Sequence, residues 1–373
     1  MAARIRVLLL TDEMEVGGTQ RQIAYLARAL DRSRFDPAVA FFRNRSFLVG
    51  ELEGAGVPVT ELPKRGRIDP RFLRSLVAFL REGRFDVMHC FAFTGELWGT
   101  VGRRLLAPAS RPALVTSVRN KYDWYSGLQW RLKRWASLQS CRIVANSRVG
   151  GEHARDMMSL PPGSVDVVYN GVADAPGAGA PPARPGGPVT ALFVGRLVEQ
   201  KNVPVLLRAM ARLRDAGVPV RLRIAGDGPL RGTCAGQVAA LGLSGVVDLM
   251  GERPDARALM ASSDFVVLPS LREGLSNVIL EAMSAGRPVI ASAVGGSVEL
   301  VEPGATGLLF PSGDDAALAA AMGALAADAA LREALGAEGR RRAIERFSVD
   351  AMARSMEAIY TACAQRRAAA SGA

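Results

Sequence analysis

The strongest constraint on this chain is a repeated alternation of short apolar strands and amphipathic helices. Aliphatic segments such as Ile5–Leu10, Val87–Cys90 and Val189–Val194 end in polar or glycine-containing loops, and helical patterns such as Gln20–Leu30 follow them. Strands that alternate with helices form parallel sheets covered by helices, and ligands bind at the carboxyl ends of such strands. The sequence therefore predicts an α/β fold with doubly wound sheets.

A proline- and glycine-rich segment, Ala175–Pro188, interrupts the alternation, which then restarts. Its composition cannot continue a helix or a strand and is typical of an interdomain linker. We expect two Rossmann-like domains in series with a cleft between them. The predicted parts are an N-terminal domain over residues 1–173, a linker over 174–188, a C-terminal domain over 189–345, and a C-terminal helix and tail over 346–373.

The cysteine and histidine content indicates reduced thiols and no metal centre. The four cysteines are Cys90, Cys141, Cys234 and Cys363, and none of them forms a CxxC pair. The chain has only 2 histidines, and no segment approaches the roughly 18–20 apolar residues of a membrane span. We expect a cytoplasmic protein without a metal or cofactor.

The positive charge lies almost entirely in the first half of the chain. Residues 1–173 hold 26 Lys and Arg against 16 Asp and Glu, whereas residues 174–373 hold 21 against 20. Such an excess indicates an anionic partner, which could be a membrane surface, a nucleic acid or a phosphorylated substrate. The alternative is a set of arginines scattered over solvated faces. No recognised nucleic-acid-binding motif accompanies the charge, so we expect no nucleic-acid partner.

The stretch Arg272–Glu299 places acidic residues around a loop that turns into a helix. Ser276 and Asn277 are capping residues for a helix that ends before Gly286, and a buried strand follows. The free backbone N–H groups at a helix start can hold an anion. The acids of this stretch are Glu273, Glu281 and Glu299.

Three further loops follow predicted strands. Gly17-Gly18 follows the first strand and allows close approach of a ligand, or it forms a plain tight turn. Arg196 and Lys201 flank a helix start after the first strand of the second domain, where two cations suit a diphosphate, unless they are ordinary surface charges. Gly226-Asp227-Gly228 forms another strand-to-helix turn.

Taken in order, these motifs resemble those of the family-4 retaining glycosyltransferases of GT-B fold. The motifs are G-R-x-x-x-x-K-N, A-G-D-G-P, E-G-L-S-N-V-I-L-E-A-M-S-A-G-R-P and V-G-G-S-V-E, and Gly17-Gly18 matches the family's N-terminal glycine loop. The pair Glu273 and Glu281, eight residues apart, is the most specific of these signals. The resemblance implies two facing Rossmann-like domains and a C-terminal helix that crosses back to the N-terminal domain.

The resemblance also implies roles for individual residues. Arg196 and Lys201 would hold the donor diphosphate, Glu273 would face the transferring sugar, and Glu281 would bind the ribose. Further donor-site positions are Gly17, Gly18, Gly226, Asp227, Gly274, Leu275, Ser276, Asn277 and Glu299. Fixed cations and helix N-termini can stabilise the departing diphosphate without a metal.

The N-terminal half departs from the family pattern. Many relatives have a histidine after one strand, where this chain has Arg119 and Asn120 in L-V-T-S-V-R-N-K. Arg119 is therefore a candidate for binding donor or acceptor phosphate. His89 ends a predicted strand and is a second candidate to line the cleft, or it is a satisfied structural histidine.

A tryptophan-rich segment around Gly127–Ser137 interleaves aromatic and basic residues. Its aromatics are Trp124, Tyr125, Trp130 and Trp135, and its cations are Lys121, Arg131, Lys133 and Arg134. This composition is typical of a helix at a membrane surface, or of core tryptophans beside a solvated basic face.

The resemblance implies a hexosyltransferase-type enzyme that uses a UDP- or GDP-linked sugar in bacterial surface-polysaccharide or glycolipid assembly. Together with the basic first half and the tryptophan-rich segment, it predicts a lipid-linked saccharide acceptor. The enzyme would lie in the cytoplasm or on the inner face of the cytoplasmic membrane. Two alternatives remain open: a GT-B-fold sugar-nucleotide epimerase, and a degenerate protein that binds sugar nucleotides without turnover.

Overall fold

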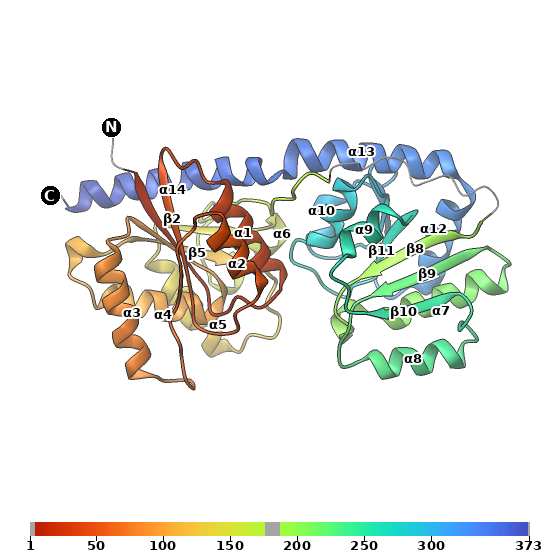
Figure 1. The fold of residues 1–373 in the computed structure, drawn as a ribbon, viewed down its shortest axis with the longest axis horizontal. Helices are drawn as coiled ribbons and strands as arrows, with labels where there is room; N and C mark the ends of the chain where they lie inside the picture. The colour runs from red at the N-terminus through yellow and green to blue at the C-terminus, as the bar shows by residue number, and fades with distance from the viewer. Residues whose placement is uncertain (1–3, 176–186, 372–373) are drawn as a thin grey trace. The chain divides into compact units, whose positions relative to one another are not determined.

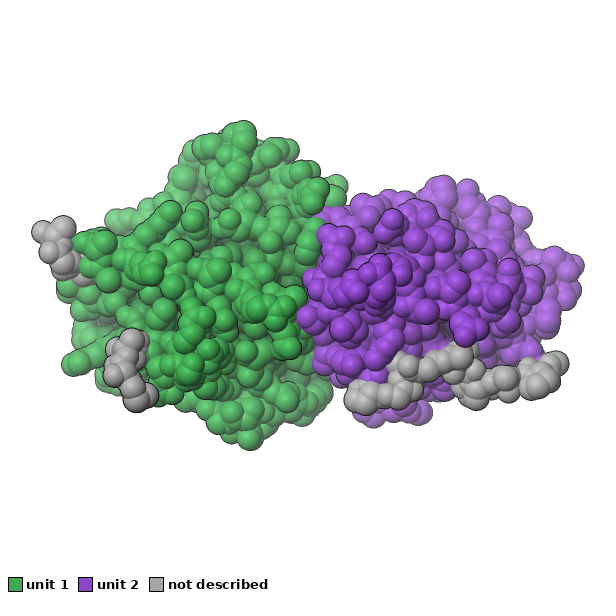
Figure 2. All heavy atoms as spheres, turned by 90° about the horizontal axis from the view of Figure 1, so that it is seen from above, with its two compact units in different colours: residues 1–171, 349–373 green, residues 172–348 purple. Residues whose placement is uncertain are grey.

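The computed structural model describes residues 4–175 and 187–371 (Figure 1). The chain divides into two compact units, of which unit 1 contains residues 1–171 and 349–373 and unit 2 contains residues 172–348 (Figure 2). The predicted linker over 174–188 falls mostly on residues outside the described ranges. The expected boundary of the C-terminal segment, residue 346, lies three residues within the end of unit 2 at Ser348.

Unit 1 contains a seven-stranded parallel sheet in the order β3-β2-β1-β4-β5-β6-β7. The strands are β1 (Ile5–Leu10), β2 (Phe35–Phe41), β3 (Val59–Glu61), β4 (Val87–Cys90), β5 (Ala113–Val118), β6 (Arg142–Ala145) and β7 (Val165–Val167). Strand β1 pairs with β2 from Ile5 opposite Phe35, and with β4 from Val7 opposite Val87. The connections run in opposite directions from β1, so the topological switch point lies between β1 and β4.

Helices cover both faces of this sheet. They are α1 (Gly18–Ala29), α2 (Phe47–Gly54), α3 (Pro70–Gly83), α4 (Ala92–Arg104), α5 (Gly127–Leu138), α6 (Arg148–Met157) and α14 (Val349–Ser371), with a short 3₁₀ turn η1 (Pro108–Ser110). Side chains alternate along β1: Val7 and Leu9 join the core under α1, α2 and α14, whereas Leu8 and Leu10 join the core under α3 and α4. Helix α2 was not expected; the Ser46 side chain caps it by accepting from Leu48 N.

Helix α14 completes unit 1, as the expected return of the C-terminal helix requires. Its buried residues Met352, Met356, Tyr360 and Cys363 belong to the same core as β1 and α1. The Glu357 carboxylate accepts from Asp31 N at 2.9 Å, and Arg367 pairs with Asp86 at 2.8 Å. Apolar packing and polar contacts therefore fix this helix along much of its length.

Unit 2 repeats the architecture with six parallel strands in the order β10-β9-β8-β11-β12-β13. The strands are β8 (Val189–Val194), β9 (Val220–Ala225), β10 (Val247–Gly251), β11 (Phe265–Leu268), β12 (Val289–Ser292) and β13 (Gly307–Phe310). The helices are η2 (Glu199–Lys201), α7 (Val203–Asp215), α8 (Arg231–Ala240), α9 (Ala256–Ala261), α10 (Asn277–Ser284), α11 (Ser297–Leu300), α12 (Asp315–Ala327) and α13 (Ala329–Phe347). The switch point lies between β8 and β11.

The expected α/β class with two Rossmann-like domains is confirmed. Among the described residues, no helix is both long and apolar enough to span a membrane.

Candidate functional site

The switch point of unit 2 brings together the loops that follow β8 and β11. Leu271 N donates to the Gln200 carbonyl at 2.8 Å, and the Gln200 side chain donates to the Arg272 carbonyl at 2.9 Å. These bonds hold two segments about 70 residues apart in the chain against each other. They place Lys201 and Glu273 at the carboxyl edge of the sheet, where ligands of this topology bind.

Lys201 and Glu273 form the charged centre of this edge. Lys201 Nζ lies 2.6 Å from Glu273 Oε1, and the side chains are only 17% and 8% exposed. The Ser270 hydroxyl donates to the same carboxylate oxygen at 2.6 Å, and the Ser292 hydroxyl donates to the Ser270 carbonyl. Lys201 and Ser270 thus fix the Glu273 carboxylate directly, and Ser292 at the end of β12 fixes Ser270 in turn. This is the kind of preorganisation that an electrostatic site needs.

Glycines allow the neighbouring loops to approach without side chains. Gly295 has φ +50°, and a Cβ on it would lie 1.9 Å from the Glu273 carbonyl oxygen. Gly296 N donates to the Gly274 carbonyl at 2.7 Å, and a Cβ there would lie 2.1 Å from that oxygen. Gly226, on the other side, would place a Cβ 1.9 Å from the Gly195 carbonyl oxygen. Any side chain at these positions would displace the loops that carry the site.

Helix α10 begins directly beside Glu273. The Ser276 hydroxyl accepts from Ile279 N, and Leu275 and Ser276 are buried while Asn277 is the first helical residue. Glu281 lies one turn further along and forms a 3.8 Å ion pair with Arg257 of α9. It lines a cavity of about 220 Å³ with Arg257, Ser284 and residues 172–175.

The remaining donor-site candidates of unit 2 lie in different environments. The Arg196 side chain is exposed and pairs with none of the residues that the structure describes. Asp227 accepts from Gly228 N at 2.7 Å and pairs with Arg231 at 3.2 Å, so its carboxylate also stabilises its own turn. Glu299 is part of the short α11, and its carbonyl accepts from Arg342 at 3.3 Å.

His89 occupies the core of unit 1. It is 2% exposed, with Nδ1 2.7 Å from the Tyr360 hydroxyl and Nε2 2.7 Å from the Ser117 hydroxyl. Burial and the nearby Arg119 guanidinium hold the pKa of His89 well below its usual value. Both ring nitrogens are engaged, and this geometry favours the structural reading of His89 over a catalytic one.

Arg119 lies at the carboxyl edge of the same sheet. Its Nη2 donates to Asn170 Oδ1 at 2.8 Å, its guanidinium lies over the Phe91 ring, and its Nε is buried without a hydrogen-bond partner among the described residues. Desolvation lowers the pKa of Arg119 to about 10, which leaves it charged at neutral pH. An unpartnered N–H group on a fixed cation can donate a hydrogen bond to an anionic oxygen atom.

The Gly17-Gly18 loop begins α1. Gly17 is the N-cap, in extended backbone, and a Cβ on it would lie 2.6 Å from the Gln20 side-chain oxygen. The Gln22 side chain forms two 2.8 Å hydrogen bonds with the backbone of Gly171. Helix α1 therefore fixes the segment that includes Asn170, the partner of Arg119.

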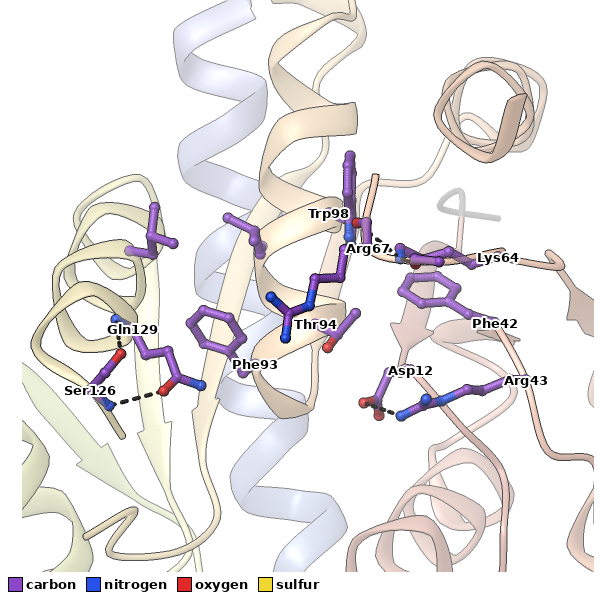
Figure 3. Close-up of a pocket in the computed structure, with 13 residues that line it drawn as sticks. Asp12, Phe42, Arg43, Lys64, Arg67, Phe93, Thr94, Trp98, Ser126 and Gln129 are labelled. Carbon is purple, nitrogen blue, oxygen red and sulfur yellow. Dashed lines mark hydrogen bonds and ion pairs between the residues drawn. The ribbon is translucent and has the colours of Figure 1, made fainter. Parts of the chain in front are cut away.

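A cavity of about 850 Å³ opens at the carboxyl ends of β1 to β4 (Figure 3). Its polar lining includes Asp12, Arg43, Lys64 and Arg67, and Figure 3 shows the Arg67 side chain extending into it beside Thr94. Its aromatic lining is Phe42, Phe93 and Trp98, and Lys64 Nζ lies 5.4 Å from the Trp98 ring centroid. Burial and Glu13 raise the pKa of Asp12.

Sequence reasoning missed these cavity residues, although one signal was present. Asp12, Arg43 and Lys64 each follow a strand at its carboxyl end, where side chains from neighbouring strands converge.

Part of the tryptophan-rich helix is buried, and this part cannot contribute to the expected membrane surface. Trp130 is only 5% exposed, and Lys133 is buried with its Nζ 2.7 and 2.9 Å from the two Glu96 carboxylate oxygens. Arg134 donates to the Met158 carbonyl at 2.7 Å. These side chains hold α5 to α4 and α6, whereas Trp124 and Leu128 are exposed by 52% and 65%.

Within the described ranges, the structure contains no group of three or more His, Cys, Asp or Glu side chains arranged to hold a metal ion.

Comparisons with known proteins agree with this geometry. Residues 16–175 match the family model Glycosyltransferase Family 4, and residues 188–328 match the model Glycosyl transferases group 1. A glycosyltransferase of Methanocaldococcus jannaschii is 28% identical over 302 residues, which cover 76% of this chain and 77% of that protein. The D-inositol 3-phosphate glycosyltransferase of Kineococcus radiotolerans is 36% identical over 261 residues, which cover 62% and 59%.

The fold agrees with that of a solved structure. The crystal structure of Anabaena HepE in complex with UDP-glucose superposes with a TM-score of 0.81 at 22% identity, covering 96% of this chain and all of that one. The two family models together span most of the chain, and each falls on one Rossmann-like unit. The chain belongs to the glycosyltransferase family 4 and group 1 enzymes and has their GT-B fold.

Proposed function

We propose that this enzyme is a retaining glycosyltransferase that moves a sugar from a UDP- or GDP-linked donor to a hydroxyl of a lipid-linked saccharide, without a metal ion. The observation that carries the proposal is the fixed Lys201–Glu273 pair at the switch point of unit 2. The Lys201 ammonium can bind the negatively charged diphosphate of a sugar nucleotide. The Glu273 carboxylate beside it can accept hydrogen bonds from the hydroxyl groups of the sugar.

The donor diphosphate binds at Lys201, Arg196 and the N-terminus of α10. Lys201 Nζ uses one N–H on Glu273 and retains two for phosphate oxygens, because an ammonium has three donors. Arg196 adds a planar guanidinium that can contact two oxygens, and the start of α10 adds backbone N–H groups that point out of the helix. As the glycosidic bond breaks, negative charge grows on the diphosphate, and these groups stabilise it in place of a divalent cation.

Glu273 accepts hydrogen bonds from the hydroxyls of the transferring sugar, and Glu281 binds the ribose. The Glu273 carboxylate keeps one oxygen, Oε2, outside the bonds to Lys201 and Ser270. The acceptor hydroxyl attacks the face from which the diphosphate departs and transfers its proton to a donor phosphate oxygen. That course retains the anomeric configuration and requires no protein nucleophile.

The acceptor binds in the cavity of unit 1. Aromatic rings and cations in one cavity suit a saccharide that carries an anionic group, because the rings contact sugar faces and the cations pair with the charge. The name of the Kineococcus relative, a D-inositol 3-phosphate glycosyltransferase, agrees with a phosphorylated acceptor. Arg119, with its unpartnered Nε, supplies a further contact for phosphate.

The exposed part of α5 and the residues before it touch the membrane. Trp124 and Leu128 are exposed apolar side chains, and Arg131 is an exposed cation on the same helix. An apolar group inserted at headgroup depth and a cation on anionic lipid together bind weakly and reversibly. Flotation with vesicles containing anionic lipid should fall for Leu128→Ser with Arg131→Gln; an unchanged bound fraction would remove the membrane proposal.

The central test incubates the purified enzyme with UDP- and GDP-sugars and a polyprenyl-diphosphate saccharide extract. We expect free UDP or GDP and an extended lipid, formed equally in the presence of a chelator. Formation of an epimeric sugar nucleotide without acceptor would establish the epimerase instead, and nucleotide binding without turnover would establish a binding protein. Loss of activity in the chelator, restored by a divalent cation, would contradict the metal-free site.

A further inference from the structure

A second cavity of unit 1 lies between α14 and the amino-terminal ends of β5 and β6. It has a volume of about 650 Å³, and two of its lining residues are cysteines, Cys141 and Cys363. Cys141 immediately precedes β6, and Cys363 lies on α14, more than 200 residues later in the chain. The Cys363 side chain belongs to the core of unit 1, and Cys141 packs against that same core.

The two thiols border the same cavity and influence each other. The Cys363 thiol and the Arg366 guanidinium of α14 both lower the pKa of Cys141. Arg142 and Arg103 are the other charged groups close to the Cys141 sulfur, and the residues that line the cavity include no carboxylate. Two thiols that border one cavity and interact with each other need only a local approach to reach the disulfide bond length of about 2.05 Å.

We propose that Cys141 is an oxidisable thiolate and that Cys363 is its resolving partner, so that a two-electron oxidant such as a peroxide converts the pair into a disulfide between β6 and α14. Reactive thiols are partly exposed and lie near positive charges, and Cys141 has such an environment. Cys141 is half-buried beside a cavity, and arginine side chains from α4, β6 and α14 surround it. Donation by Cys363 and the charge of Arg366 lower the pKa of Cys141 to about 6.

The chemistry balances in two steps. The Cys141 thiolate attacks one peroxide oxygen, the O–O bond breaks, hydroxide leaves, and Cys141 becomes a sulfenic acid. The Cys363 sulfur then attacks the Cys141 sulfur, the S–O bond breaks, and the hydroxyl departs as water with the thiol proton. The two cysteines together lose two electrons and the peroxide gains them. A thiol reductant reverses the bond.

The other two cysteines provide internal controls. Cys90 is buried in the opposite face of the sheet, and burial and the nearby Glu96 raise its pKa well above its usual value. Cys234 is buried on α8 of unit 2, and burial raises its pKa as well. Both are expected to remain thiols while the Cys141–Cys363 pair reacts, because the thiolate is the nucleophile.

The test treats the full-length enzyme with hydrogen peroxide, blocks remaining thiols by alkylation, and maps the peptides by mass spectrometry without reduction. We expect a cross-linked peptide joining Cys141 and Cys363 that dithiothreitol cleaves. Separately, brief alkylation of the untreated enzyme at pH 7 should modify Cys141 at least about tenfold faster than Cys234, since each unit of pKa changes the thiolate fraction by that factor.

Single substitutions distinguish the oxidised cysteine, Cys141, from its resolving partner, Cys363. Cys141→Ser should abolish the cross-link and leave Cys363 unoxidised, whereas Cys363→Ser should leave a sulfenic or sulfinic acid on Cys141. Cys234→Ser is the matched control and should behave as the wild type, with circular dichroism confirming that each variant is folded. The proposal is overturned if the folded wild type forms no Cys141–Cys363 cross-link when its thiols are oxidised, or if Cys141 is alkylated no faster than Cys234.

Discussion

At the scale of single residues, Glu273 has two roles in the proposed donor site. The Glu273 carboxylate holds Lys201 and Ser270 in fixed positions, and the proposed mechanism gives its second oxygen to the sugar. Because Glu273 has both roles, even an isosteric substitution of Glu273 should reduce the rate of sugar transfer strongly.

Replacement of Glu273 by Gln should reduce sugar transfer by about 100-fold or more, because it removes a preorganised charge that acts at the reacting centre. The initial rate of nucleotide release with acceptor present measures this effect. Glu338→Gln is the matched control, since Glu338 also pairs with an arginine but does so on the exposed surface of α13. Wild-type rates for the Glu273 variant would contradict the proposed role.

His89 makes a prediction about stability rather than rate. Its pKa in the folded enzyme lies well below the value of about 6.5 in an unfolded chain. The unfolded state therefore binds more protons below pH 6.5, and the free energy of unfolding falls as the pH is lowered through that value. The loss of stability due to His89 grows as the pH is lowered further below that value.

Urea unfolding of the full-length enzyme, with the unfolding of unit 1 followed at several pH values, tests this prediction. His89→Asn should be less stable than the wild type at pH 7.5 and should lose less stability between pH 7 and pH 5. An identical pH dependence in the two proteins would show that His89 is not the group that titrates.

At the scale of whole elements, glycine contacts determine how closely the donor-site loops approach. Gly295→Ala should displace the Glu273 backbone, because φ +50° and a 1.9 Å approach leave no space for Cβ. We expect loss of most transfer activity, with unfolding of unit 2 at lower urea concentration. Gly236→Ala on α8 is the control; nothing lies within 4 Å of its Cβ position, and alanine favours the helix. Equal activity of the two variants would contradict the loop packing.

The elements also show what the sequence can and cannot predict. Lys201 and Glu273 could be expected to meet, because each follows one of the two strands at the switch point of a predicted parallel sheet. Lys133 could not be assigned, since a lysine among tryptophans on an amphipathic helix is typical of a solvated or membrane-facing surface. Its partner Glu96 lies on α4, 37 residues earlier, and only the tertiary packing of α4 and α5 buries both. The cavity of unit 1 was missed for a similar reason, since its lining comes from three loops, after β1, β2 and β3, and from the helices α4 and α5.

At the scale of the molecule, the enzyme has two Rossmann-like units. Their first six strands follow the same order, and unit 1 adds a seventh strand, but the charges and cavities of the two units differ. Unit 1 contains most of the net positive charge of the chain, an aromatic and basic cavity, and the thiol pair. Unit 2 is nearly neutral, and its proposed donor site lies at one edge of its sheet, around Lys201 and Glu273. We infer that acceptor selection resides in unit 1 and donor binding in unit 2.

The most direct test of this account is calorimetric titration of UDP and GDP into the wild type and into Lys201→Ala. The wild type should bind one of the two nucleotides. The variant should bind it at least about tenfold more weakly, a loss of about 1.4 kcal/mol, because a phosphate contact disappears and Glu273 is left without its cation. Arg208→Ala, which removes an exposed partner of Asp315, should bind as the wild type does. Unchanged affinity in Lys201→Ala, or no binding of either nucleotide by the wild type, would contradict the donor site.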